Sequence, residues 1–273
     1  MTRLCLHCSP SPKKALLITN RKYVKNPLPN GMRNSHWLAE RLQTFGFVCT
    51  VHVDLDIDAM RTAIGTFINS LSPGDTVVVY FTGHSKRIGT SLYNTSITPK
   101  CRIAVASIFK AIREHMRYGQ VLYIGDTCSA DKRDCHYGNC MPTDQQWFDK
   151  YRTRDVHNIT NSADASTKNG PFKTCLQNVQ FTMLLASEPG TNAYSDGNPN
   201  LSRFTAAIIA FMSPAVFLYK NTAPAYSMYD FYSDVYAHMY NDQNKYQKPY
   251  LTASGGGLYI YCADCDHLKR RAL

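Results

Sequence analysis

Two apolar stretches of the sequence each lead into a residue type that can take part in acyl transfer. Residues 76–82 (TVVVYFT) and 120–126 (QVLYIGD) are short apolar runs that predict buried strands. The first is followed by His84 and the second by Cys128. Because the carboxyl ends of neighbouring parallel strands share one edge of a sheet, these side chains can meet although 128 − 84 = 44 residues separate them. A thiol beside an imidazole predicts a cysteine nucleophile with its base.

Hydrolysis through a thioester is the chemistry that such a pair supports. The Cys128 thiolate would attack a peptide carbonyl, and His84 would protonate the leaving amine before water releases the acyl group. The backbone N–H groups of Ser85 and Cys128 could form the oxyanion hole. The alternative is structural, because a cysteine at a strand end often serves as a small buried side chain. The flanking strands favour the catalytic interpretation.

Hydrophobic periodicity predicts the elements that position this pair. Strands that alternate with helices, joined by right-handed crossovers, predict an α/β fold with a six-stranded, mostly parallel sheet between helical layers. The predicted strands are 14–19, 47–53, 76–82, 120–126, 179–186 and 258–261. The predicted helices are 32–45, 58–71, 103–117, 203–212 and 226–240, the second of them capped or begun by Asp58.

A long polar stretch divides the predicted domain. Residues 131–178 carry no periodic pattern, and a connection of this length is usually functional or flexible. We therefore predict one domain over residues 14–262. The domain has a large part at 14–130 and a small part at 179–262. An amino-terminal segment with a C-x-x-C unit (1–13) precedes it, and a basic carboxy-terminal tail (263–273) follows it.

Composition limits the classes of function. The 273 residues are 44% hydrophobic, which is ordinary for a globular protein with a sizeable core. The net charge of +10 would allow nucleic-acid binding, but the basic residues are scattered and no nucleic-acid-binding motif accompanies them, so nucleic acid is not an expected partner. The sequence has no signal-peptide core and no apolar run near the ~18 residues of a membrane span. We expect a cytoplasmic protein with no membrane partner.

Several segments, taken in order, resemble the caspase-like cysteine peptidases, the group that contains caspases, metacaspases and paracaspases. They are ALLITN (15–20), LAERLQTFGF (38–47), YFTGHS (80–85), DTCS (126–129), LASEPG (185–190) and SRFTAAI (202–208). The resemblance covers residues 14–262 and implies a caspase-like fold and a cysteine endopeptidase with His84 and Cys128 as its dyad.

The resemblance also implies residues that bind substrate. DTCS is similar to the metacaspase and paracaspase pattern, in which the Asp two residues before the Cys helps to accept a basic P1 residue, and this Asp is Asp126. Asn34 begins the Asn-Ser pair that stands where metacaspases have Asn-Asp. Caspases hold an acidic P1 residue with an Arg near this point, so Arg33 keeps that alternative open. Ser187 falls in the substrate-binding region. The structural alternative for Asp126 is an Asp that accepts backbone N–H groups in a turn.

One position departs from the family pattern. Ser85 stands where the family usually has Gly after the catalytic His. This departure leaves open a second function, that of an inactive homologue that regulates by binding. Related enzymes cut themselves between their large and small parts. In this chain self-cleavage could occur after the basic residues Lys132, Arg133, Arg152 or Arg154, or after the acidic residues Asp155 or Asp164. The alternative is that this segment is an ordinary solvated surface loop.

Cofactors and partners follow from weaker signals. Two C-x-x-C units could together form a tetrahedral zinc site of Cys5, Cys8, Cys262 and Cys265, or these residues could be free thiols. The dyad needs no cofactor, and the likeness to metacaspases implies calcium dependence although no ligand cluster identifies a calcium site. The expected partners are protein substrates and a second copy of the chain. The resemblance implies a role in cell-death or regulatory proteolysis.

Overall fold

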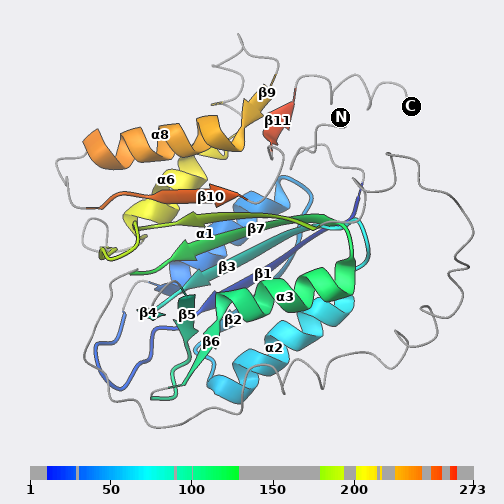
Figure 1. The fold of residues 1–273 in the computed structure, drawn as a ribbon. Helices are drawn as coiled ribbons and strands as arrows, with labels where there is room; N and C mark the ends of the chain where they lie inside the picture. Colours follow the sequence, from blue (N-terminus) through cyan, green and yellow to red (C-terminus); the bar gives the residue numbers. More distant parts are fainter. Residues whose placement is uncertain are drawn as a thin grey trace, which may run out of the picture.

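The computed structural model describes residues 11–28, 31–88, 91–99, 101–128, 179–193, 201–213, 216, 225–241, 247–253 and 259–262. Its centre is a six-stranded sheet with helices on both faces (Figure 1). In sheet order the strands are β10 (Tyr250–Ala253), β8 (Val179–Leu185), β7 (Gly119–Asp126), β3 (Thr76–Thr82), β1 (Lys13–Thr19) and β2 (Val48–Val53). All neighbours run parallel except β10, which lies antiparallel to β8 at one edge. The predicted mostly parallel α/β fold is therefore confirmed.

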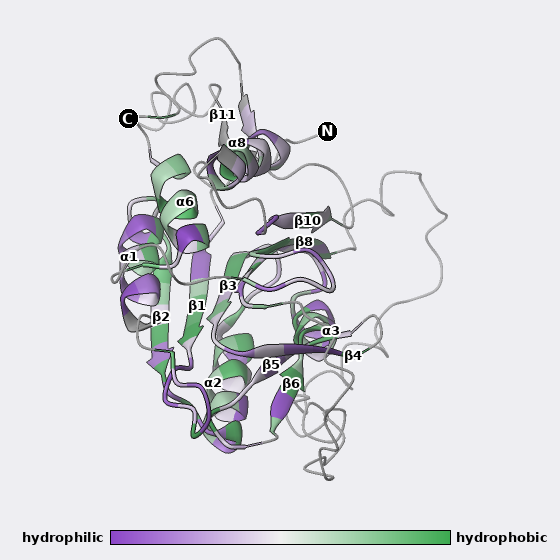
Figure 2. Cartoon of the chain, turned by 90° about the vertical axis from the view of Figure 1, so that its left-hand side faces the viewer, coloured by the Kyte–Doolittle hydropathy of each residue, from purple (hydrophilic) through white to green (hydrophobic). Residues whose placement is uncertain are grey.

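Two helical layers explain why the central strands are apolar on both faces. Every residue of β3 is buried, as expected for a parallel strand that is covered from both sides. Helices α1 (Gly31–Gln43), α6 (Arg203–Phe211) and α8 (Met228–Asn241) supply one hydrophobic cluster, and α2 (Ile57–Ser70) and α3 (Val105–Met116) supply the other. The sheet strands are mainly hydrophobic, whereas α1 and α2 alternate between hydrophilic and hydrophobic residues (Figure 2). The amphipathic stripes thus face the sheet.

Two smaller sheets lie outside this sandwich. Strands β4 (Ser85–Ile88), β5 (Ser91–Thr95) and β6 (Arg102–Ala104) form an antiparallel sheet beside the carboxyl end of β3 (Figure 1). Strands β9 (Ala225–Ser227) and β11 (Tyr259–Cys262) form a separate pair. None of the helices among the described residues has the length and apolar character needed to cross a bilayer.

The predicted sixth strand of the main sheet was wrong. The segment predicted at 258–261 forms β11, but it pairs with β9, which occupies residues assigned to the start of a helix. The sixth member is instead β10, a four-residue edge strand with two exposed positions, which carries too short an apolar pattern to be recognised. The three-stranded β4–β5–β6 sheet was not predicted either, because its strands are only three to five residues long.

The start of α2 also differs from the prediction. The capping residue is Asp56, whose Oδ1 accepts a hydrogen bond from the Ala59 backbone N–H at 2.8 Å. Asp58 lies inside the first turn, where its negative charge interacts favourably with the positive end of the helix dipole. Its Oδ1 lies 3.4 Å from Arg61 Nη1. Two nearby acids can each fit a helix start, and only the backbone geometry separates them.

Candidate active site

His84 and Cys128 lie at equivalent points beyond two adjacent parallel strands. In the β3–β7 register Thr82 pairs with Asp126, so His84 and Cys128 each follow a paired position by two residues. Both side chains line one cavity of about 450 Å³ at this edge of the sheet. The structure thus brings the two residues to the same edge of the sheet, and their catalytic roles stay predictions.

The imidazole of His84 is held by the loop that follows β1. His84 Nε2 lies 2.7 Å from the Asn26 carbonyl oxygen, and because a carbonyl can only accept, Nε2 carries the proton. Nδ1 is then the nitrogen that can exchange a proton with a substrate or a thiol. The ring of Tyr23 lies against the imidazole, with 4.4 Å between ring centroids. These contacts fix both the position and the tautomer of the candidate base.

Tyr23 joins three segments around His84. Its hydroxyl accepts the His84 backbone N–H at 2.9 Å and donates to the Thr95 carbonyl oxygen at 3.3 Å. Burial raises the pKa of Tyr23 to about 12, so the hydroxyl keeps its proton at neutral pH. The approach depends on Gly83, which has φ +155 and where an added Cβ would lie 2.5 Å from the Tyr23 hydroxyl oxygen.

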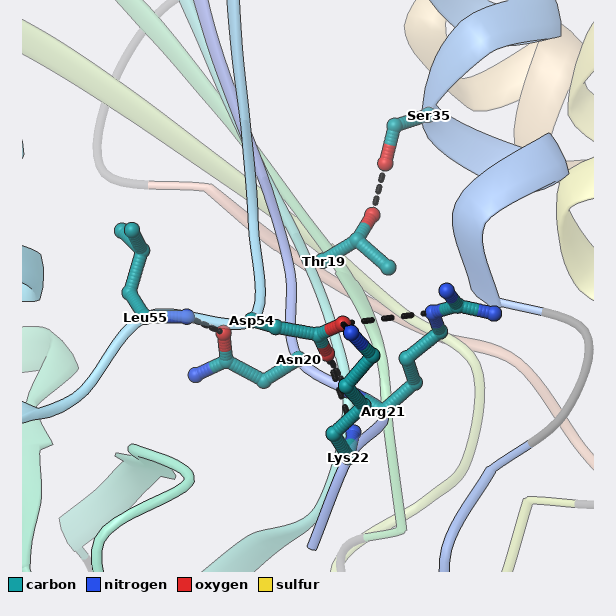
Figure 3. Close-up of polar contacts among 7 residues, drawn as sticks. All are labelled: Thr19, Asn20, Arg21, Lys22, Ser35, Asp54 and Leu55. Carbon is teal, nitrogen blue, oxygen red and sulfur yellow. Dashed lines mark hydrogen bonds and ion pairs between the residues drawn. The ribbon is translucent and has the colours of Figure 1, made fainter.

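Asp54 anchors the start of this loop to the end of β2 (Figure 3). Its Oδ1 accepts the backbone N–H groups of Arg21 at 2.8 Å and Lys22 at 2.9 Å, and its Oδ2 lies 3.3 Å from Arg21 Nε. Asn20 accepts the Leu55 backbone N–H at 2.9 Å. The carboxylate therefore ties the loop that carries Tyr23 and Asn26 to a neighbouring strand.

Cys128 makes hydrogen bonds with two other segments, the start of β4 and the chain after β8. Its thiol lies 3.5 Å from the Ala193 carbonyl oxygen, in the segment after β8. The Ser85 hydroxyl donates to the Cys128 carbonyl oxygen. The residue after His84 is thus linked directly to the candidate nucleophile. Their backbone N–H groups stay the predicted oxyanion donors.

Asp126 is the last residue of β7, and its side chain faces α1 and α6. It is not among the residues that line the cavity. Its Oδ2 accepts hydrogen bonds from Thr205 Oγ1 at 2.7 Å, Asn34 Nδ2 at 3.3 Å, the Tyr80 hydroxyl at 3.4 Å and the Ser202 hydroxyl. All four donors are neutral side chains, not the backbone N–H groups of a turn. Burial raises the pKa of Asp126, and the hydrogen bonds oppose this shift. The described residues include no Lys, Arg or His in an ion pair with this carboxylate.

The two other predicted substrate-binding residues occupy different environments. Ser187 is fully buried, and its hydroxyl lies 3.3 Å from the carbonyl oxygens of both Thr127 and Thr191. It braces the residue before Cys128. Arg33 is exposed in the first turn of α1, one residue before Asn34. Neither side chain lines the described cavity, and their roles toward substrate stay predictions.

Only one of the four predicted zinc ligands lies within the described part of the chain. Cys262 ends β11, opposite Ala225, while Cys5, Cys8 and Cys265 fall outside the described residues. Among the described residues, no group of three His, Cys, Asp or Glu side chains could hold a metal ion. Zinc therefore stays a sequence-based prediction.

Comparison with known proteins places the whole fold in one family. The caspase domain profile matches residues 12–256. The chain belongs to the caspase domain family. This is a family of cysteine peptidases, so the family predicted from the sequence segments is confirmed. No curated protein matches the sequence.

Two solved structures share the fold of this chain. Caspase-1 from Spodoptera frugiperda is similar with a TM-score of 0.59 and 13% identity, covering 93% of this chain and 91% of its own. Protein GSU0716 from Geobacter sulfurreducens is similar with a TM-score of 0.56 and 14% identity, covering 90% of this chain and 94% of its own. At such low identity the likeness concerns the fold.

Sequence reasoning missed the residues that hold His84, the candidate base. Asn26 acts through its backbone carbonyl, which leaves no signature in residue type. Tyr23 and Asp54 lie 61 and 30 residues from His84, in segments that periodicity assigns to loops. A polar residue within two positions of a strand end is the one available signal, and Asp54 shares it with His84.

Proposed function

We propose that this chain is a cysteine endopeptidase with His84 and Cys128 as its catalytic dyad. The observation that carries the proposal is their equivalent placement, two residues beyond paired positions of β3 and β7 and on the wall of one cavity. A thiol and an imidazole with a free Nδ1 are the groups that nucleophilic acyl transfer requires. Membership of a peptidase family supports the same reaction.

The proposed reaction uses these groups in two steps. The Cys128 thiolate attacks the carbonyl carbon, and the protonated His84 gives its Nδ1 proton to the leaving amine as the C–N bond breaks. Water then attacks the thioester, with His84 taking its proton, and the acid and the thiol are released. The Nε2 hydrogen bond to Asn26 holds the ring throughout. The backbone N–H groups of Ser85 and Cys128 would stabilise the oxyanion, where each donor typically contributes 100-fold or more, as an order of magnitude.

A basic P1 residue is the substrate feature that Asp126 supports. Its carboxylate is buried among neutral donors, which leaves its charge without a cationic partner among the described residues. Burying an unpaired charge is unfavourable, and an incoming Arg or Lys would relieve that cost. The alternative is that Arg33 binds an acidic side chain at P1, and it predicts Asp or Glu at the position where the Asp126 proposal predicts Arg or Lys.

Paired fluorogenic peptides that end in Arg, Lys or Asp test both the activity and the P1 preference. Wild-type protein should cleave the Arg and Lys peptides, Cys128→Ala should lose cleavage, and Cys49→Ala on β2 should retain it. Each assay is run with and without calcium, since calcium dependence is the cofactor property implied by likeness to metacaspases. Cleavage that survives in Cys128→Ala, or a preference for Asp, would refute the corresponding part of the proposal.

Alkylation gives a readout that does not depend on the choice of peptide. Burial raises the pKa of the Cys49 thiol to about 11, so this residue should react slowly with iodoacetamide near neutral pH. Cys128 lines the cavity and should react before Cys49. Peptide mapping by mass spectrometry identifies the modified thiol, and preferential labelling of Cys49 would contradict the assignment of Cys128 as nucleophile.

A second candidate function, an inactive homologue that acts by binding, is favoured by Ser85. Its hydroxyl donates to the Cys128 carbonyl oxygen, a contact that the usual Gly could not make. If this contact holds the oxyanion loop in an unproductive conformation, Ser85→Gly should gain activity that wild type lacks. Activity of wild type without this change would exclude the inactive homologue.

A further inference from the structure

The cavity beside the dyad extends from Cys128 toward the His84 side. Apart from Cys128 and Asn192, the lining residues that the structure describes come from three segments. These are the loop after β1 (23–26), His84 with the start of β4 (84–86), and the connection from the end of β5 to the start of β6 (95–99, 101 and 102). The group that protonates the leaving amine must stand on the leaving-group side of the scissile bond. With His84 as that group, in line with the proposed function, the residues after the bond would bind in this cavity.

The charge of this cavity is one-sided. Lys25, Lys86 and Arg102 line it, and no Asp or Glu is among the lining residues that the structure describes. The guanidinium of Arg102 lies over the Tyr93 ring, 5.0 Å from its centroid, which fixes the position of this charge. Lys86 is half-buried on β4, two residues after His84, and Lys25 is exposed at the mouth. Clefts lined by one sign of charge concentrate ligands of the other sign.

The size and remaining lining of the cavity fit a short peptide. Its volume of about 450 Å³ lies within the range of ligand-binding pockets. Val24, Ile97 and Pro99 add apolar surface between the charges, so the stems of acidic side chains can contact carbon while their carboxylates reach the cations.

We propose that this cationic cavity binds acidic residues on the leaving-group side of the substrate, at P1′ and P2′. The proposal rests on the proposed peptidase function and adds a specificity determinant to it. Asp or Glu at these positions would pair with Lys25, Lys86 and Arg102, whereas Lys or Arg there would be repelled. Asp126 would thus select the residue before the scissile bond, and the cavity cations would select the residues after it.

Internally quenched peptides with a fixed unprimed half ending in Arg test this specificity. The primed half is Asp-Glu, its neutral match Asn-Gln, or Lys-Lys. We expect kcat/KM to be roughly 10-fold higher for Asp-Glu than for Asn-Gln at low salt, and the ratio to shrink as salt screens the charges. Equal values for the acidic and neutral peptides would overturn the proposal.

Charge reversal identifies the residues that produce the preference. The double variant Lys25→Glu/Lys86→Glu should lose or invert the Asp-Glu to Asn-Gln ratio. Lys110→Glu is the matched control, because this exposed lysine lies on α3 and does not line the cavity. It should keep the wild-type ratio. A double variant that folds and retains the preference would refute the assignment to this cavity.

Binding to the inactive protein separates this proposal from the proposed activity. If wild type cleaves none of the peptides, the peptidase function fails, but the cavity can still be tested with Cys128→Ala. Fluorescence polarisation of labelled Asp-Glu and Asn-Gln product peptides should then show roughly 10-fold tighter binding of the acidic one, lost in the charge-reversed background. Equal affinities would overturn the proposal whatever the fate of the activity.

Discussion

Removing the Tyr23 hydroxyl tests whether the loop after β1 positions His84, the proposed catalytic base. Tyr23→Phe keeps the ring that lies 4.4 Å from the His84 imidazole, but it deletes the acceptor of the His84 backbone N–H and the donor to the Thr95 carbonyl. A buried donor left unsatisfied costs about 1–3 kcal/mol. For a chain of this size that corresponds to a fall in Tm of about 2–4 °C per kcal/mol.

Activity should change together with stability in this variant. Displacing a catalytic group by a fraction of an ångström can reduce the rate roughly 10-fold or more, so kcat should fall while KM changes little. Because the pKa of Tyr23 is about 12, the loss of stability should be constant across neutral and mildly alkaline pH. Urea unfolding and steady-state kinetics well below Tm measure both effects.

The control for this variant is a tyrosine that makes no such contacts with His84. Tyr229 is 70% exposed, and Tyr229→Phe should change the free energy of unfolding by less than about 0.5 kcal/mol. If Tyr23→Phe proves as neutral as this control in both stability and kcat, the hydroxyl does not position His84 and the reasoning is refuted.

Substitutions at three further positions, Gly83, Asp54 and Asp126, test the residues around the candidate site. Gly83→Ala should lower both stability and kcat because its Cβ would lie 2.5 Å from the Tyr23 hydroxyl oxygen, whereas Gly46→Ala, strained at φ +80 with nothing within 4 Å, should lower stability alone. Asp54→Ala should cost about 1–3 kcal/mol more than Asp54→Asn, which keeps the acceptor for two backbone N–H groups; equal urea-unfolding energies would contradict this. The raised pKa of Asp126 means that the native state holds this proton more tightly than the unfolded chain, so unfolding free energy should fall as pH rises between the two pKa values. Asp126→Asn should remove this pH-dependent fall in unfolding free energy and reduce kcat/KM for Arg peptides roughly 10-fold. If the difference in unfolding free energy between wild type and Asp126→Asn is the same at every pH, the raised pKa of Asp126 is excluded.

The elements that the sequence predicts correctly are those whose burial follows a regular pattern. The strands β1, β3 and β7 are apolar because both faces are covered, and α2 shows a stripe that the sheet covers. The edge strand β10 has one partner and two exposed residues, so its residues carry little information about pairing. Pairing partners depend on the whole fold, which is why β11 was assigned to the wrong sheet.

The candidate site divides in the same way. His84 and Cys128 can be predicted as the candidate dyad because strand-end positions and residue types both point to them. Their supports were not, since Asn26 contributes a carbonyl group and Asp54 acts through the backbone of Arg21 and Lys22. Asp126 was identified by likeness, but its four neutral donors come from segments up to 92 residues distant and could be known only from the structure.

The two specificity proposals make opposite charge demands on the two sides of the scissile bond. A buried carboxylate at Asp126 favours a basic residue before the bond, and the cationic cavity favours an acidic residue after it. The chain itself contains three bonds of this type, Arg113–Glu114, Arg133–Asp134 and Arg154–Asp155. The first lies within α3, where the helical backbone cannot extend into an active site, whereas the other two fall in the segment predicted to separate the large and small parts.

Peptides that copy these two bonds therefore provide a test with sequences native to the chain. Octapeptides centred on 133–134 and 154–155 should be cleaved between Arg and Asp, and replacing that Asp by Asn should lower kcat/KM roughly 10-fold. Replacing the Arg by Gln should lower kcat/KM separately, by roughly 10-fold, because Asp126 then has no cationic partner in the peptide. The two replaced residues lie on opposite sides of the scissile bond and are proposed to contact different sites, Asp126 and the cationic cavity. Their effects on the transition-state free energy should therefore add. Strong non-additivity would mean that a single subsite reads both charges, and the division of specificity between Asp126 and the cavity would be wrong.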